Sequence, residues 1–153
     1  MARTRNLFAS CGLAAACLGL AACEPSPRLP AEAPVMQADG VTHAGADQNG
    51  GAVTLQADGV LRVELETIPT AGYIWEVVSQ PAFLELVDEA TRPTDPEFQN
   101  QEGVTGGNHF MAFDFQAVAA GTGRIEMVEH RPWEENVQPS GTWHIDVTAQ
   151  AAP

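Results

Sequence analysis

Three short segments of this 153-residue chain combine residue types that are suited to contacting a partner. They are Pro69–Tyr73 (Pro-Thr-Ala-Gly-Tyr), Gly103–Asn108 (Gly-Val-Thr-Gly-Gly-Asn) and Arg131–Trp133 (Arg-Pro-Trp). A proline fixes its backbone φ angle and so lowers the conformational entropy that a segment loses on association. A tryptophan beside an arginine is typical of an interface hot spot. These residue types favour binding over catalysis.

The segments offer a partner several kinds of contact. Gly106 and Gly107 have no side chains, so their backbone can approach a partner closely, and the Thr70 hydroxyl can donate or accept a hydrogen bond. The candidate binding residues are Pro69, Thr70, Ala71, Gly72, Tyr73, Gly103, Gly106, Gly107, Asn108, Arg131, Pro132 and Trp133. Each segment also has a purely structural interpretation: a hairpin turn, a flexible loop, and a tryptophan that folds back onto the domain.

The other reactive side chains do not form a recognisable catalytic or metal-binding pattern. The four histidines, at positions 43, 109, 130 and 144, lack the spacing of metal ligands. Ser79 and Ser140 lack the glycines that flank the serine of a nucleophile elbow. We therefore expect no metal, no cofactor and no enzymatic activity, and a small hydrolase is disfavoured.

The charge balance excludes one large class of function. Twenty Asp and Glu residues stand against seven Arg and no Lys, for a formal net charge of −13. Nucleic-acid binding needs a basic face, so it is excluded. The 44% of apolar residues is enough for a packed core, and 14 Gly with 11 Pro indicate a turn-rich chain.

The N-terminus has the pattern of a targeting segment. Arg3 and Arg5 precede an apolar run, which predicts a signal peptide over residues 1–22. Leu20-Ala21-Ala22-Cys23 resembles a bacterial lipobox, in which the cysteine becomes the lipid-bearing first residue. This predicts lipidation of Cys23 and a membrane lipoprotein of the bacterial cell envelope. The alternative is an ordinary cleaved signal. All three cysteines fall at or before position 23.

The remaining chain divides into a spacer, one domain and a short tail. Residues 23–50 are rich in Pro, Ala, Gly and Asp and are predicted to be a flexible tether. Residues 51–149 alternate apolar and polar residues, and 150–153 are a tail. The alternation predicts seven strands without a helix, at 53–56, 61–66, 73–78, 83–87, 111–116, 124–128 and 142–148. This spacing favours an all-β, immunoglobulin-like sandwich of about seven to eight strands, with Trp75 in its core.

The strand count also places the three candidate segments. Alternate connections of a sandwich lie at the same end. The segments around Thr70, from Thr91 to Asn108, and around Trp133 are separated by even numbers of predicted strands. We therefore expect them to lie side by side, as the loops of an antibody do.

This ordered set of loops resembles that of the chagasin-like inhibitors of papain-type cysteine proteases. That family carries an Asn-Pro-Thr-Thr-Gly-aromatic loop, a Gly-x-Gly-Gly loop and an Arg-Pro-Trp loop. Pro69, Thr70, Gly72 and Tyr73 match the first, Gly106-Gly107 the second, and Arg131-Pro132-Trp133 the third. The chain departs from the family pattern at Ile68 and Ala71, and Val104-Thr105 separate Gly103 from the other two glycines.

The resemblance implies an immunoglobulin-like sandwich and a reversible, non-covalent inhibitor whose protein partner is a papain-family cysteine protease. Pro69–Tyr73 would cover the catalytic Cys–His pair, Gly103–Asn108 would follow the unprimed side of the cleft, and Arg131–Trp133 would occupy the primed side. We expect a monomer that meets the membrane only through its lipid. The alternative is a lipid-anchored cell-envelope binding or structural module whose loops serve another ligand.

Overall fold

The computed structural model describes residues 35–36 and 40–151. The strands in these residues are β1 (Val35–Met36), β2 (Thr42–Ala44), β3 (Gly51–Leu55), β4 (Val60–Thr67), β5 (Ile74–Ser79), β6 (Leu84–Pro93), β7 (His109–Ala117), β8 (Gly121–His130) and β9 (Gly141–Ala149). Three short helical segments join them: η1 (Ala46–Gln48), η2 (Pro69–Ala71) and α1 (Pro96–Gln99). No helix in the described part of the chain is long and apolar enough to cross a membrane.

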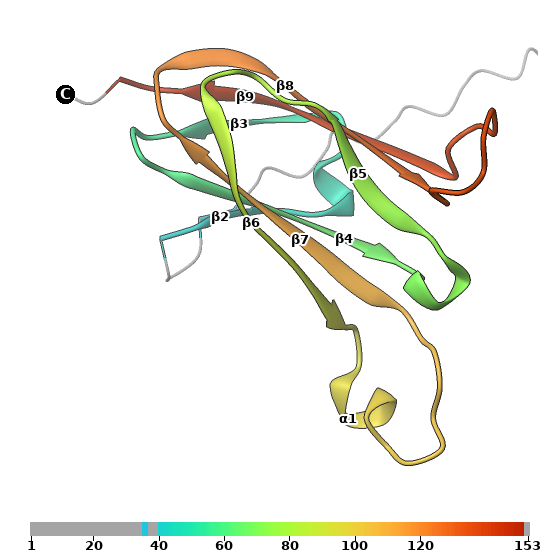
Figure 1. Ribbon diagram of the computed structural model, residues 1–153. Helices are drawn as coiled ribbons and strands as arrows, with labels where there is room; N and C mark the ends of the chain where they lie inside the picture. The colour runs from blue at the N-terminus through green and yellow to red at the C-terminus, as the bar shows by residue number, and fades with distance from the viewer. Residues whose placement is uncertain (1–34, 37–39, 152–153) are drawn as a thin grey trace, which may run out of the picture.

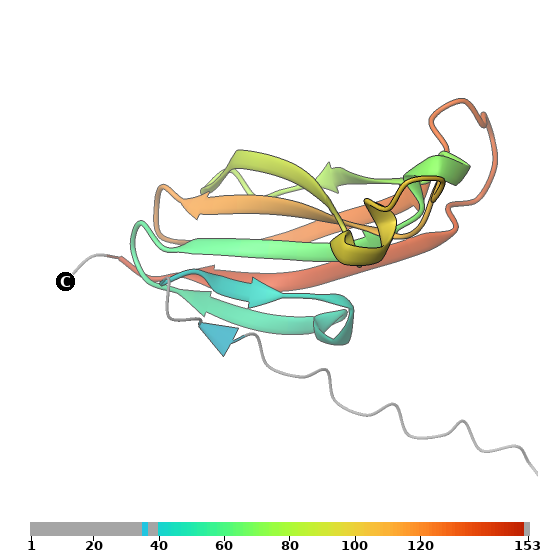
Figure 2. The same cartoon turned by 90° about the horizontal axis from the view of Figure 1, so that it is seen from below.

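The strands form two sheets that pack face to face (Figures 1 and 2). One sheet has the order β1-β2-β4-β7-β6 and the other the order β3-β9-β8-β5. β2 lies parallel to β4 and β3 lies parallel to β9, whereas the other pairs are antiparallel. The predicted all-β, immunoglobulin-like sandwich is confirmed.

The apolar half of each alternating strand fills the space between the sheets. In β4, Leu61, Val63 and Leu65 are buried, and their neighbours Arg62 and Glu64 are not. Successive side chains of a strand point to opposite faces, so this alternation buries one face and leaves the other to solvent. The other fully buried large residues include Leu55, Phe113, Phe115, Ile125, Met127, Ile145 and Val147.

Two tryptophans belong to the body of the sandwich. Trp143 in β9 is 2% exposed, and its Nε1 donates to the carbonyl oxygen of Gly45 at 2.9 Å. Trp75 in β5 is partly buried, packs against the core, and donates from Nε1 to the carbonyl oxygen of Glu66 at 2.9 Å. The prediction for Trp75 therefore holds only in part, because Trp143 is the tryptophan that fills the interior.

The folded domain begins earlier than the predicted boundary at residue 51. β2 pairs with β4 in the register Thr42↔Leu61, and both Thr42 and Ala44 are buried. The backbone N–H of Gly50 then donates to the backbone carbonyl oxygen of His144 at 2.8 Å. The predicted tether over 23–50 is thus corrected at its C-terminal part, where small residues join a sheet through backbone hydrogen bonds. The predicted signal peptide and Cys23 lie outside the described residues.

The outer strands β5 and β6 depart from regular pairing. The register of β6 against β7 shifts between Leu86 and Asp88, and that of β5 against β8 shifts between Val77 and Ser79. β6 also continues to Pro93, beyond the predicted strand at 83–87, and is followed by the four-residue helix α1, which was not predicted. The second half of β6 is mostly polar and exposed, so it lacks the apolar alternation that predicts a strand.

Candidate functional site

Three loops meet at one end of the sandwich. Loop A (residues 68–73) joins β4 to β5, loop B (94–108) joins β6 to β7, and loop C (131–140) joins β8 to β9 (Figure 1). The register pairs Thr67 with His109, His109 with Pro93, and Ile74 with His130, so all three loops leave the strands at the same end of the sandwich. The predicted clustering of the three segments is confirmed.

Loop A is a compact turn with its tip exposed. Ala71 and Gly72 donate backbone N–H groups to the carbonyl oxygens of Ile68 (3.0 Å) and Pro69 (2.8 Å). Gly72 ends the turn at φ +86°, in the left-handed region that glycine adopts without a steric penalty. Thr70 and Ala71 are the exposed residues of the tip. The local hydrogen bonds therefore hold Thr70 in one place at the end of the domain.

Loop B is held by the side chain of one glutamine. Gln99 Nε2 donates to the carbonyl oxygens of Asn108 (3.0 Å) and Gly106 (3.4 Å). Gly103, Gly106 and Gly107 have φ angles of +83°, +86° and +110°, so the fold of this loop depends on glycine. A Cβ atom on Gly106 would lie 3.5 Å from Thr70 Oγ1, which places loop B directly beside loop A.

Loop C begins with a tight turn that presents Trp133. Glu134 donates its backbone N–H to the carbonyl oxygen of Arg131 at 3.0 Å, and Pro132 occupies the second position of this turn. Trp133 is 66% exposed, yet its ring lies so close to Gly72 that a Cβ atom there would overlap it. Trp133 thus rests on loop A and offers most of its surface to solvent.

The bases of loops A and C share one carboxylate. Glu129 Oε1 accepts a hydrogen bond from Thr67 Oγ1 at 2.9 Å, and Glu129 Oε2 accepts one from Ser140 Oγ at 2.8 Å. Thr67 is 2% exposed, and its hydroxyl also lies 3.0 Å from the carbonyl oxygen of Tyr73, so its single proton is shared between the two acceptors. Sequence reasoning did not single out Glu129, because nothing in the alternation of β8 distinguishes it from its acidic neighbour Glu126.

Phe98 is a second residue that sequence reasoning missed. It lies on α1 within loop B and is 56% exposed. Asp95 caps the helix by accepting from the backbone N–H of Phe98 at 3.0 Å, and Pro96 occupies the first turn. The sequence Asp-Pro-Glu-Phe-Gln carries both helix-start signals, so this short helix could have been recognised.

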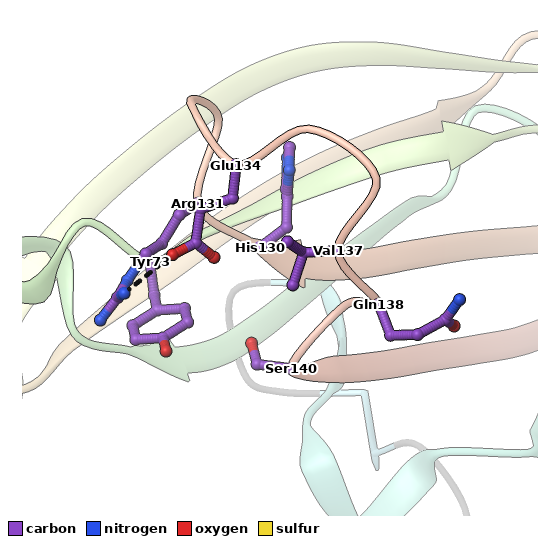
Figure 3. A pocket seen from close by; sticks show the side chains of 7 residues that line it. All are labelled: Tyr73, His130, Arg131, Glu134, Val137, Gln138 and Ser140. Carbon is purple, nitrogen blue, oxygen red and sulfur yellow. Dashed lines mark hydrogen bonds and ion pairs between the residues drawn. The ribbon is translucent and has the colours of Figure 1, made fainter.

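A small pocket of about 80 Å³ lies between loop C and the start of β5 (Figure 3). Its lining residues are Tyr73, His130, Arg131, Glu134, Val137, Gln138 and Ser140. Ligand sites usually measure at least about 300 Å³, so this pocket is too small for a substrate. No group of three His, Asp or Glu residues within the described chain is arranged to hold a metal ion.

The positive charges of the domain are all engaged locally. Each arginine in residues 40–151 lies within 3.0 Å of a carboxylate, in the pairs Arg62–Asp114, Arg92–Glu64, Arg124–Asp146 and Arg131–Glu134. The many other carboxylates leave the domain strongly negative. Loop A, in contrast, contains no charged residue.

Comparison with known proteins agrees with this geometry. The sequence model described as "Chagasin family peptidase inhibitor I42" matches residues 54–147, which contain all three loops. The chain belongs to the chagasin family. This family consists of peptidase inhibitors, so the chagasin-family chain described here is not an enzyme.

Two solved structures are similar to this chagasin-family chain. A cysteine protease inhibitor from Entamoeba histolytica superposes with a TM-score of 0.59 at 17% identity, over 71% of this chain and 93% of that one. Amebosin superposes with a TM-score of 0.53 at 25% identity, over 71% of this chain and 96% of that one. A comparison with curated protein sequences gave no match. The structural similarity establishes the shared sandwich fold.

Proposed function

We propose that this chain is a reversible, non-covalent inhibitor of papain-like cysteine proteases that blocks the active-site cleft with loops A, B and C. One observation carries the proposal: the three loops that define the family resemblance converge and support one another. Trp133 rests on Gly72, and Gly106 lies beside Thr70. A surface that is already ordered loses less conformational entropy when it binds.

Each loop then has a distinct place in the cleft. By resemblance to the family, loop A covers the catalytic Cys–His pair with the exposed residues Thr70 and Ala71. Loop B follows the unprimed side through the backbone of Gly106 and Gly107, and loop C places Trp133 on the primed side. Protease–inhibitor interfaces bury about 1,600 Å² in total, and three adjacent loops can supply one side of such an interface.

Inhibition by this domain is occlusion and not chemistry. The folded residues contain no cysteine, so no mixed disulfide with the protease thiol can form. The uncharged tip of loop A can enter the cleft without the desolvation cost of a buried charge. The departures at Ile68 and Ala71 fall within loop A and are the places where target preference would differ from that of other family members.

A titration of the full chain against active papain tests the proposal. Saturable inhibition without cleavage of the chain is expected, and Trp133→Ala should weaken it by at least about 2 kcal/mol, as hot-spot truncations do. Val118→Ala is the matched control, because Val118 is 51% exposed but follows β7 at the opposite end of the sandwich. No inhibition of papain or of other papain-like enzymes would favour an envelope module with a different ligand.

The proposal extends to where the inhibitor acts. The lipobox-like sequence ending at Cys23 supports a lipid anchor in the bacterial envelope, with the domain presented beyond the membrane surface. Cys23→Ser should move the chain from the membrane fraction to the soluble fraction without changing its inhibition constant. Retention of the variant in the membrane fraction would contradict the lipid anchor and leave the inhibitory function untouched.

A further inference from the structure

Arg131 and Tyr73 are brought together by strand pairing. β5 and β8 pair in the register Ile74↔His130, so the residues just beyond, Tyr73 and Arg131, leave the sheet side by side. The guanidinium carbon of Arg131 lies 4.4 Å from the centre of the Tyr73 ring, within cation–π distance (Figure 3). A register set by the sheet thus joins the end of loop A to the start of loop C.

The polar edge of the same guanidinium is also engaged. Arg131 Nη1 donates to Glu134 Oε1 at 3.0 Å, as the dashed line in Figure 3 shows. Arg131 Nε is buried and has no hydrogen-bond partner within the described part of the chain. The flat face rests on Tyr73 and one edge on Glu134. The side chain is therefore held between loops A and C, with 32% of its surface exposed.

These contacts stabilise the turn that carries Trp133. The main-chain hydrogen bond from Glu134 to Arg131 and the ion pair between their side chains close the same four-residue turn. Pro132 and Trp133 are its two central residues. Because Arg131 also stacks on Tyr73, the turn cannot rotate away from loop A without breaking this contact.

We propose that Arg131 is a positioning residue, which fixes the Trp133 indole against Gly72 and so sets where it enters the protease cleft. This inference rests on the proposed inhibitory function, and it differs from a direct contact between Arg131 and the protease. A direct contact would use the guanidinium's exposed edge and would act independently of Tyr73 and Glu134. A positioning role makes the effects of Arg131 and Glu134 depend on each other.

The test uses the full chain in mild detergent and measures inhibition of papain in 0.5 M NaCl, where long-range charge effects are screened. Arg131→Met should raise the inhibition constant about tenfold, as expected for loss of a cation–π contact and an ion pair. Glu134→Gln should raise it about threefold. The double variant should equal Arg131→Met alone. Arg124→Met and Glu126→Gln, both at exposed positions of β8 outside the three loops, are the matched controls and should have no effect.

A second measurement reads the position of Trp133 without any protease. The indole N–H groups of Trp75 and Trp143 donate to backbone carbonyls, and Trp133→Phe identifies the third indole resonance by its loss. In the ¹⁵N relaxation of the free protein, Arg131→Met should make the Trp133 indole more mobile, and Arg124→Met should not. Arg131→Lys keeps the charge but lacks the planar fork, so it should give an intermediate result.

Two results would overturn the inference. One is an Arg131→Met variant with wild-type inhibition and wild-type indole relaxation. The other is weaker inhibition with unchanged relaxation and additive losses for Arg131 and Glu134, which would assign Arg131 to direct protease contact. If the wild-type chain inhibits no papain-like protease, the proposed function fails, and the relaxation of Trp133 alone decides whether Arg131 positions it.

Discussion

Replacing Gly72 with alanine should weaken inhibition by displacing Trp133 while leaving the domain folded. The backbone at Gly72 has φ +86°, which costs a residue with a Cβ about 1–2 kcal/mol of stability. The new Cβ would also occupy the space of the Trp133 ring, which would have to leave loop A. Displacing a hot-spot tryptophan costs about 2 kcal/mol or more of binding free energy, so the inhibition constant should rise about 30-fold.

Gly50→Ala separates the backbone strain from the displacement of the tryptophan. Gly50 has a similar φ of +78°, but a Cβ there would lie 3.7 Å from the His144 ring, an ordinary contact. Thermal melts should show both variants losing about 1–2 kcal/mol of stability. Titration against papain should show weakened inhibition for Gly72→Ala only.

A double variant completes the test. If Gly72 acts through Trp133, Gly72→Ala should add little to the loss already caused by Trp133→Ala. The reasoning is refuted if Gly72→Ala inhibits as well as Gly50→Ala does. It is also refuted if the two losses simply add, since loop A would then have been damaged independently of the indole.

Four further predictions follow from single features. Phe98→Ala should weaken inhibition about tenfold without lowering the melting temperature, because its ring is 56% exposed on α1, the helix whose Gln99 binds the carbonyl oxygen of Gly106 in loop B. Raising NaCl from 0.05 to 0.5 M should slow association with a protease that is basic around its cleft, measured by stopped flow, because the domain is strongly negative. Glu129→Gln should lower the melting temperature and weaken inhibition together, since Glu129 joins the bases of loops A and C. A hydrogen bond from Arg124 lowers the pKa of Asp146 from its ordinary value of 3.8 in the folded protein. The pair therefore contributes stability above pH 3.8, and this contribution is lost as the pH falls through the lowered pKa of the folded state. Thermal melts between pH 2 and 7 should show less acid destabilisation for Asp146→Asn than for the wild type.

The sequence predicts the sandwich because burial imposes a period of two on each central strand. Leu61, Val63 and Leu65 display that period, and the structure buries all three. β2 escapes such an analysis because it is three residues long and joins the sheet through its backbone. Backbone pairing leaves no apolar pattern, which is why the predicted tether ran too far into the domain.

The candidate site could be located from the sequence but not assembled. Loop order placed Gly72 and Trp133 at the same end, yet their direct contact depends on the geometry of two separate turns. The stacking of Arg131 on Tyr73 depends on the register of β5 against β8. Register is a property of the paired strands, so a residue's type alone could not show that Arg131 meets Tyr73.

The irregular outer strands β5 and β6 affect whether a strand from another molecule can pair with the domain. An exposed strand edge is a template for adding a strand from another molecule, and natural proteins block it with bulges and charges. The register shift in β6 lies beside Glu85, Asp88 and Glu89, and β5 carries its own shift between Val77 and Ser79. These irregularities disfavour the addition of a foreign strand along β5 and β6, the two edge strands that border loops A and B, so the strands next to the loop end are poor sites for intermolecular β-pairing.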